Sequence, residues 1–188
     1  MKVQKFYIIP LLIVLNSFFV NSTSMFELSL QALITGADKI VQVKVTDVIS
    51  QWDKDSSVIF TYVRMNIVDD LIGADENNEI TIIQPGGIVG NTSLHVEGVS
   101  QYNVGEEDVL FLFQDKRNKE TFQTLGMYQG KYKIFMDNNN VKRVKQDNSA
   151  SVEQYKKKGR GYVETGNNKT LDDFKNSILQ YVDKNKAH

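Results

Sequence analysis

The residue types that commonly do chemistry are scarce in this sequence, and His95 and Glu97 form the first pair to consider. The 188-residue chain has two histidines and no cysteine. In an extended segment, residues two apart project from the same face, as two metal ligands would. A zinc site generally needs at least three protein ligands, and a third is not evident. We therefore expect a solvated His95 and predict no metal and no cofactor.

A glycine-rich stretch, Gly86-Gly87-Ile-Val-Gly90, is superficially similar to a phosphate-binding loop. It lacks the Lys-Ser/Thr ending and the following helix that would direct amides and a helix dipole at a phosphate. Turn geometry explains these glycines better than nucleotide binding does.

The adjacent carboxylates Glu106 and Glu107 are candidates for an acid/base pair. Neighbouring residues of a β-segment tend to face opposite ways, so solubilising a loop is the simpler role. The nucleophile motif Gly-x-Ser-x-Gly is absent from the sequence, and two histidines without a cysteine leave few nucleophile–base pairs. We therefore assign no catalytic residue, and an envelope hydrolase that uses carboxylates stays open as an alternative.

Three aromatic residues, Phe60, Tyr62 and Phe135, fall on strand faces opposite the expected core. If those faces are exposed, they form a binding surface of the kind that barrels present. If helices cover those faces, the three residues belong to the core. The sequence leaves both readings open.

The elements that would position these residues are arranged around the stretch Glu79–Gly90. It is a β-branched strand that ends at Pro85, because proline has no amide proton for a ladder. Gly86 and Gly87 can adopt positive φ values, so we expect the chain to fold back at this point. Two long strands precede it, at 37–50 and 59–68.

The pattern within these long strands predicts which side chains face the core. Val41, Val43 and Val45 alternate with polar residues, as in a half-buried strand. The alternation slips at Asp47, which predicts a bulge there. In the second strand, Ile59, Val63, Met65 and Ile67 share the expected core face.

Further strands follow the glycine turn, and a helix lies at each end of the mature chain. The strands are predicted at 93–97, 109–113, 130–136 and 141–144. A capping box from Ser24 to Glu27 starts a short helix that stops at Gly36. Thr170 caps an amphipathic helix with the apolar residues Leu171, Phe174, Ile178, Tyr181 and Val182, which would pack on the sheet or in a partner's groove.

Seven or so strands, of which the first two are long and bent, fit a small closed barrel. The bulge and the glycines are the devices that allow closure. The sequence therefore predicts a mainly β protein, an OB-like Greek-key barrel with a short N-terminal helix and a C-terminal amphipathic helix. A β-sandwich is the alternative.

The N-terminus has the pattern of a secretory signal. Lys2 and Lys5 precede an apolar run at 6–20, with small residues at Ser22 and Ser24. We predict a signal peptide at 1–24, a barrel domain at 25–146, a flexible linker at 147–169 and the C-terminal helix at 170–188. The apolar run is short for a transmembrane span, so we expect a secreted or periplasmic protein without a stable membrane span; an uncleaved N-terminal anchor is the alternative.

The composition is that of an ordinary globular domain, with 41% hydrophobic and 24% charged residues. The net charge is −1, and removal of the signal takes away two lysines and no acid, leaving about −3. Nucleic-acid binding relies on concentrated Lys and Arg, so we expect no nucleic-acid partner. Without cysteine there is no disulfide, and the hydrophobic core alone must hold an exported fold.

Several short motifs recur in this order in a group of exported bacterial proteins that the chain resembles from about residue 37 to residue 136. They are Ala37-Asp38, Trp52, Ile59-Phe-Thr61, Leu71-Ile-Gly73, Gln84-Pro-Gly-Gly87, Val96-Glu-Gly98, Gly105-Glu-Glu107, Leu110-Phe-Leu112 and Gln129-Gly-Lys131. The resemblance implies an exported barrel and no particular activity. A weaker resemblance links the Ala37-Asp38 opening to the OB-like domain of tissue inhibitors of metalloproteinases, which chelate zinc through an N-terminal cysteine that this chain lacks.

Taken together, these features predict an exported, non-catalytic binding domain whose ligand is a protein or peptide. The carboxylate hydrolase and a protease-inhibitor-like module are the alternatives. Loops on a rigid barrel are where binding residues gather, so we place the binding surface at Gln84, Gly86, Gly87, His95 and Glu97. On the competing account, the same glycines only close the barrel.

Overall fold

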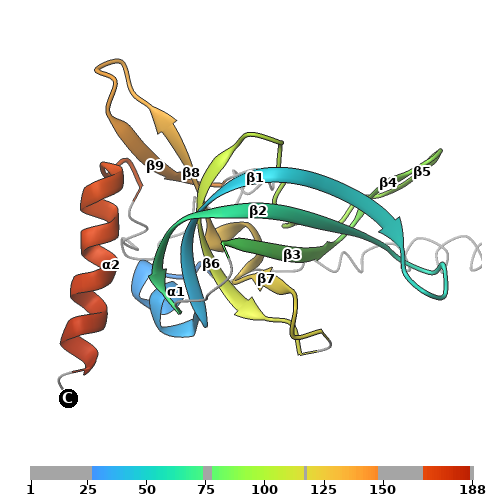
Figure 1. Ribbon diagram of the computed structural model, residues 1–188, viewed down its shortest axis with the longest axis horizontal. Helices are drawn as coiled ribbons and strands as arrows, with labels where there is room; N and C mark the ends of the chain where they lie inside the picture. Colours follow the sequence, from blue (N-terminus) through green and yellow to red (C-terminus); the bar gives the residue numbers. More distant parts are fainter. Residues whose placement is uncertain (1–26, 74–77, 117, 148–166, 187–188) are drawn as a thin grey trace, which may run out of the picture.

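The computed structural model describes residues 27–73, 78–116, 118–147 and 167–186. Five strands of one sheet close into a barrel (Figure 1). They are β1 (Lys39–Trp52), β2 (Ile59–Ile72), β3 (Glu79–Pro85), β6 (Glu107–Gln114) and β7 (Phe122–Thr124). Around the barrel the order is β1-β2-β3-β7-β6, and β6 pairs with β1 to complete the ring.

The strand order confirms the predicted OB-like barrel. The fifth strand of the ring, β7, lies between the third and the fourth and runs parallel to β3, whereas the other neighbours are antiparallel. The predicted signal peptide and residues 148–166 of the predicted linker lie outside the described residues, so the proposed domain limits stay predictions.

The bulge predicted at Asp47 is present. Val45 pairs with Met65 and Asp47 with Arg64, so Thr46 is an extra residue in β1. Val41, Val43 and Val45 precede the bulge and are buried inside the barrel. The bulge bends the remainder of β1.

The apolar run of β6 is covered on both faces, as its pattern predicted. Leu110 and Leu112 belong to the cluster that fills the barrel. Val109 and Phe111 belong to a second cluster between the sheet and the two helices. The sheet therefore has one core inside the barrel and another outside it.

The helices α1 (Leu30–Gly36) and α2 (Leu171–Lys186) cover one end of the barrel (Figure 1). Leu30, Leu33 and Ile34 of α1 are buried, and the helix ends at Gly36 as predicted. The capping residue was predicted wrongly, since Ser29 rather than Ser24 accepts the hydrogen bond, from the amide of Ala32.

The start of α2 is as predicted, because the Thr170 hydroxyl accepts a hydrogen bond from the amide of Asp173 at 3.1 Å. Its apolar stripe contacts the barrel and α1, with Phe174 and Ile178 fully buried. The stripe therefore packs within the chain and not in a partner's groove.

The remaining strands form two hairpins. In the first, β8 (Lys131–Met136) and β9 (Lys142–Gln146) extend the main sheet from β6. In the second, β4 (Gly87–Val89) and β5 (Thr92–Leu94) form a small separate sheet, which Figure 1 shows on the side of the molecule away from α2.

One prediction about the chain near β3 was wrong, and one strand was missed. The chain does not fold back at the Pro-Gly-Gly stretch; Val89 pairs with Thr92, so the reversal comes at Gly90 and Asn91. The strand β7 was not predicted, because three residues with two polar side chains give no readable period.

Candidate functional site

The residues predicted as a binding surface lie near one another in the chain, but the structure gives several of them other roles. Gln84 donates a hydrogen bond from Nε2 to the carbonyl of Ser100 at 2.8 Å. This contact holds the end of β3 against the segment before β6, so it occupies the Gln84 side chain in the fold.

Gly86 and Gly87 are required by close packing. Their φ angles are +99° and +134°, values that side chains with a Cβ rarely adopt. The Gly86 carbonyl accepts a hydrogen bond from Thr61 Oγ1 at 2.7 Å, and a Cβ on Gly87 would overlap Ser50 Oγ and Thr61 Oγ1. Backbone conformation and close packing are therefore sufficient reasons for glycine at positions 86 and 87.

His95 and Glu97 are both exposed, and neither lies in a strand. The strand predicted at 93–97 ends at Leu94, and a turn follows at Glu97 and Gly98. The two side chains therefore do not project from one strand face. Within the described residues, no three His, Cys, Asp or Glu side chains come together in a way that could hold a metal.

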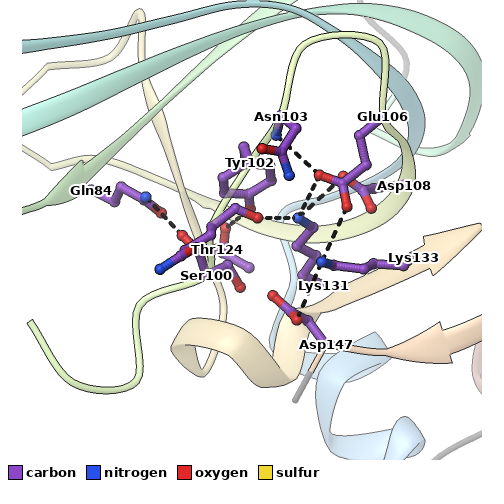
Figure 2. Close-up of polar contacts among 11 residues, drawn as sticks. Gln84, Ser100, Tyr102, Asn103, Glu106, Asp108, Thr124, Lys131, Lys133 and Asp147 are labelled. Carbon is purple, nitrogen blue, oxygen red and sulfur yellow. Dashed lines mark hydrogen bonds and ion pairs between the residues drawn. The ribbon is translucent and has the colours of Figure 1, made fainter. Parts of the chain in front are cut away.

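A buried group of charged residues lies beside the segment that leads into β6 (Figure 2). We call it the lysine cluster, and its members are Tyr102, Glu106, Asp108, Lys131, Lys133 and Asp147. The first three come from residues 102–108, the lysines from β8, and Asp147 from the end of β9. The side chains of Lys131 and Asp108 are fully buried.

The amine of Lys131 is the centre of this cluster. It donates a hydrogen bond to the Gln101 carbonyl at 2.6 Å and lies 3.3 Å from Glu106 Oε2 and 3.5 Å from Asp108 Oδ2. It also lies 3.9 Å from the centroid of the Tyr102 ring, which is the geometry of a cation–π contact. Figure 2 shows these groups converging on the amine.

Lys133 and Asp147 complete the cluster on its more exposed side. Lys133 Nζ lies 3.2 Å from Glu106 Oε1 and 3.8 Å from Asp147 Oδ1. Glu106 therefore contacts both lysines, one through each carboxylate oxygen. The backbone amide of Asn103 donates a further hydrogen bond to Glu106 Oε2 at 3.1 Å.

The two carboxylates that contact Lys131 are shifted in opposite directions. Burial raises the pKa of Asp108 to about 7, against the opposing effect of Lys131. Apart from the Lys131 amine, 3.5 Å from Oδ2, no hydrogen-bond donor among the described residues reaches the Asp108 carboxylate. Burial also favours a higher pKa for Glu106, but Lys131, the Asn103 amide and Lys133 outweigh it and lower that pKa.

This geometry gives the lysine cluster a structural role. Its most perturbed carboxyl, Asp108, is sealed from solvent, and its accessible carboxyl, Glu106, is held ionised by two lysines. Glu107 instead pairs with Lys142 at 2.7 Å. The carboxylates 106 and 107 thus have different lysine partners and show no shared site for a substrate.

The sequence did not reveal this cluster. Alternation along β8 puts Lys131 and Tyr132 on opposite faces of the strand, and both residues are fully buried. One signal was present: the motifs Gly105-Glu-Glu107 and Gln129-Gly-Lys131 meet here, through Glu106 and Lys131.

A different surface carries half-buried aromatic and aliphatic side chains on the outside of the barrel, together with the exposed Ile49. Cross-strand pairing aligns three rows on the outside of β1, β2 and β3, which we call the outer strand face. The rows are Asp47–Arg64–Thr81, Ile49–Tyr62–Ile83 and Gln51–Phe60–Pro85. This answers the open question about Phe60 and Tyr62: both are half-buried and point away from the barrel core. Phe135 is elsewhere, in β8.

The outer strand face is hollowed next to the loop between β6 and β7. A depression of about 270 Å³ is lined by Ile49, Gln51, Tyr62, Arg64, Thr81, Glu120 and Thr121. The middle row is apolar, and Ile49 is 41% exposed. In the first row, Arg64 and Asp47 form an exposed ion pair at 3.5 Å, so the apolar row has a polar border.

No protein-family model matches the chain, and no curated protein matches its sequence. None of the helices in the described part of the chain has the length and apolar character needed to cross a membrane.

Proposed function

We propose that this protein is an exported, non-catalytic binding domain that holds a protein or peptide ligand on its outer strand face. The observation that carries the proposal is the apolar row Ile49–Tyr62–Ile83, which lies across three strands and is partly open to solvent. The other ends of β1 and β2 are covered by α1 and α2, whereas the row itself lies away from the helices.

The position and chemistry of the face support this proposal. In OB-like barrels, the surface of the second and third strands, between the β1–β2 loop and the loop before the fifth strand, is a recurrent binding site, known for oligonucleotides and oligosaccharides; it supports the position of the site and not the class of ligand. Here those loops are residues 53–58 and 115–121. Aromatic and aliphatic groups within a polar border are typical of surfaces that bind proteins, and the paired charges of Arg64 and Asp47 offer no basic track for a phosphate backbone.

A peptide-display selection on the purified mature protein tests the proposal. Enriched peptides are measured by fluorescence anisotropy against the wild type, Tyr62→Ser and the control Ile88→Ser, which changes a 69% exposed side chain on β4. We expect Tyr62→Ser to weaken binding by about tenfold or more and Ile88→Ser to change it less than about twofold. Circular dichroism checks that both variants are folded.

Two results would count against this function. One is a selection that enriches no peptide. The other is a set of peptides that bind the wild type and Tyr62→Ser equally well. Export rests on the N-terminal pattern alone, and N-terminal sequencing of the mature protein tests it: a chain that still begins at Met1 would contradict signal removal.

A further inference from the structure

The strand β3 has a second edge that the barrel uses at one position only. On one side, residues 79–85 pair with β2 without interruption. On the other side, a single pair, Ile82 with Phe122, joins β3 to β7. No described strand pairs with Glu79 or Thr81 on that side. The barrel is therefore closed at Ile82, and the start of β3 is an open strand edge.

The direction of the backbone at this edge follows from the ladder with β2. The amide of Ile67 donates to the carbonyl of Asn78, and the amide of Gly86 donates to the carbonyl of Ile59. Because backbone groups of an antiparallel strand alternate in direction, even-numbered residues of β3 point at β2. The amide and carbonyl of Glu79 and the amide of Thr81 therefore point to the open side, whereas the Thr81 carbonyl faces the amide of Phe122 in the single parallel pair.

The position of Pro85 is consistent with this alternation of backbone direction along β3. It is odd-numbered, so its nitrogen also points away from β2, where the absent amide proton costs the ladder nothing. The chain thus already carries a proline at an outward-pointing position of the same strand. This makes proline at Thr81 a reasonable substitution to test.

A groove of about 690 Å³ lies along the open edge, which we call the edge groove. It is lined by Asn78, Glu79, Ile80, Thr81, Gln114, Lys119, Glu120 and Phe122. Ile80 and Phe122 supply apolar surface, and Lys119 and Glu120 are exposed charges of both signs on the opposite wall. The groove forms because β3 and the chain before β7 diverge from their single parallel pair.

We propose that an extended segment of a partner polypeptide binds in the edge groove as an added β-strand on Glu79–Thr81 of β3. This rests on the proposed function and gives the binding mode of the same ligand, because Thr81 and Glu120 line both the edge groove and the depression at Tyr62. A polypeptide backbone is the ligand whose donors and acceptors repeat with the spacing of a strand edge.

The charges of the edge groove agree with this occupant. Glu79 lies on β3, and Lys119 and Glu120 lie on the opposite wall, so a backbone with side chains of either sign can be accommodated. An incoming strand also alternates its side chains between two faces, one toward Ile80 and Phe122 and the other toward solvent. Backbone pairing therefore supplies affinity, and the apolar contact selects alternate residues.

The test uses a peptide that binds the wild type and requires Tyr62. In a scan of that peptide, single N-methyl groups are placed at successive positions, each of which removes one backbone donor. Because the Glu79 carbonyl is the acceptor left open on Glu79–Thr81, strand addition predicts that one position of the scan weakens binding by about tenfold or more while the positions on either side of it have little effect. Docking through side chains alone predicts no such single sensitive position.

The protein side of the interface is tested in parallel. Thr81→Pro removes the outward amide and should weaken the same peptide by about tenfold, whereas the matched control Thr81→Val retains the amide and should bind within about twofold of the wild type. Hydrogen exchange of the Thr81 amide should slow when the peptide binds. Circular dichroism confirms that both variants fold.

The outcomes separate this inference from the proposed function. A peptide that needs Tyr62 but tolerates every N-methyl group, and binds Thr81→Pro as well as the wild type, overturns strand addition and leaves the proposed function standing. No peptide binding at all overturns both. A concentration-dependent dimer that protects the Thr81 amide without peptide also overturns the inference, since a second copy of the chain would then occupy the edge.

Discussion

Asp108 is a buried carboxyl whose charge changes near neutral pH. Lys131, Lys133, Glu106, Asp147 and Tyr102 surround it on β8, the segment before β6 and the end of β9. Its pKa is about 7 in the folded protein, compared with an ordinary value of 3.8. Because the folded-state pKa is raised, the protonated carboxyl stabilises the fold, and that contribution is complete below pH 4 and is lost as the pH rises through 7.

We therefore predict that the free energy of unfolding falls by about 2–3 kcal/mol between pH 5 and pH 8. Asp108→Asn should remove most of this slope. Groups with a lowered pKa, such as Glu106 and Asp137, lose their stabilising effect only at more acidic pH. Urea denaturation at the two pH values measures the slope.

The neighbouring variant Glu107→Gln is the matched control for this measurement. Its carboxylate pairs with the part-exposed Lys142, so the slope should persist in it. An Asp108→Asn variant that unfolds with the wild-type slope would show that another group is responsible.

At the scale of elements, the helix α2 contributes one large aromatic side chain to the hydrophobic cluster between the sheet and the two helices. Phe174 is fully buried. Its ring centroid lies 4.7 Å from that of Tyr132 and 6.3 Å from that of Phe111. These rings come from α2, β8 and β6, so the helix joins the barrel through an aromatic cluster and not only through the ion pair of Lys175 with Asp69.

Removing this ring should destabilise the protein strongly. Phe174→Ala is expected to lower the free energy of unfolding by about 3–5 kcal/mol, because it leaves a cavity among buried rings. Leu179→Ala changes a 40% exposed side chain on the same helix and should cost less than about 1 kcal/mol. Equilibrium urea unfolding of both variants gives the comparison, and similar small costs would mean that α2 does not pack on the barrel in solution.

At the scale of the whole molecule, the barrel is closed unevenly. Long ladders join β1 to β2 and β1 to β6, whereas one residue pair joins β3 to β7. The opening of a barrel requires the loss of only the contacts at its weakest junction, so local opening should occur there at a lower free energy than elsewhere.

Native-state hydrogen exchange should therefore show earlier exchange at the β3–β7 junction. We expect the amides of Ile83 and Phe122 to exchange by a local opening, while those of Val43 and Val63 exchange only near the global free energy of unfolding. Uniform protection of all four amides would contradict a weak junction. The same region contains the edge groove, so a lower local stability there is consistent with a strand edge that accepts a ligand.

The sequence by itself determined the features that depend on neighbours along the chain. The alternation of Val41, Val43 and Val45 set the inward face of β1, and the broken alternation at Asp47 located the bulge. The continuous apolar run of β6 required cover on both faces, and Thr170 set the start of α2. These features are local because side-chain direction repeats with a fixed period within one element.

Only the tertiary structure decided which outward-facing strand surface is covered by other segments, the one with Phe60 and Tyr62 or the one with Lys131. The pattern placed Phe60 and Tyr62 on one face, but it could not show that the helices leave this pair open. Nor could it show that residues 101–108 enclose Lys131. It also could not show that the three residues of β7 close the ring beside β3. Burial and strand pairing depend on segments far apart in sequence, and no local period encodes which of them will meet.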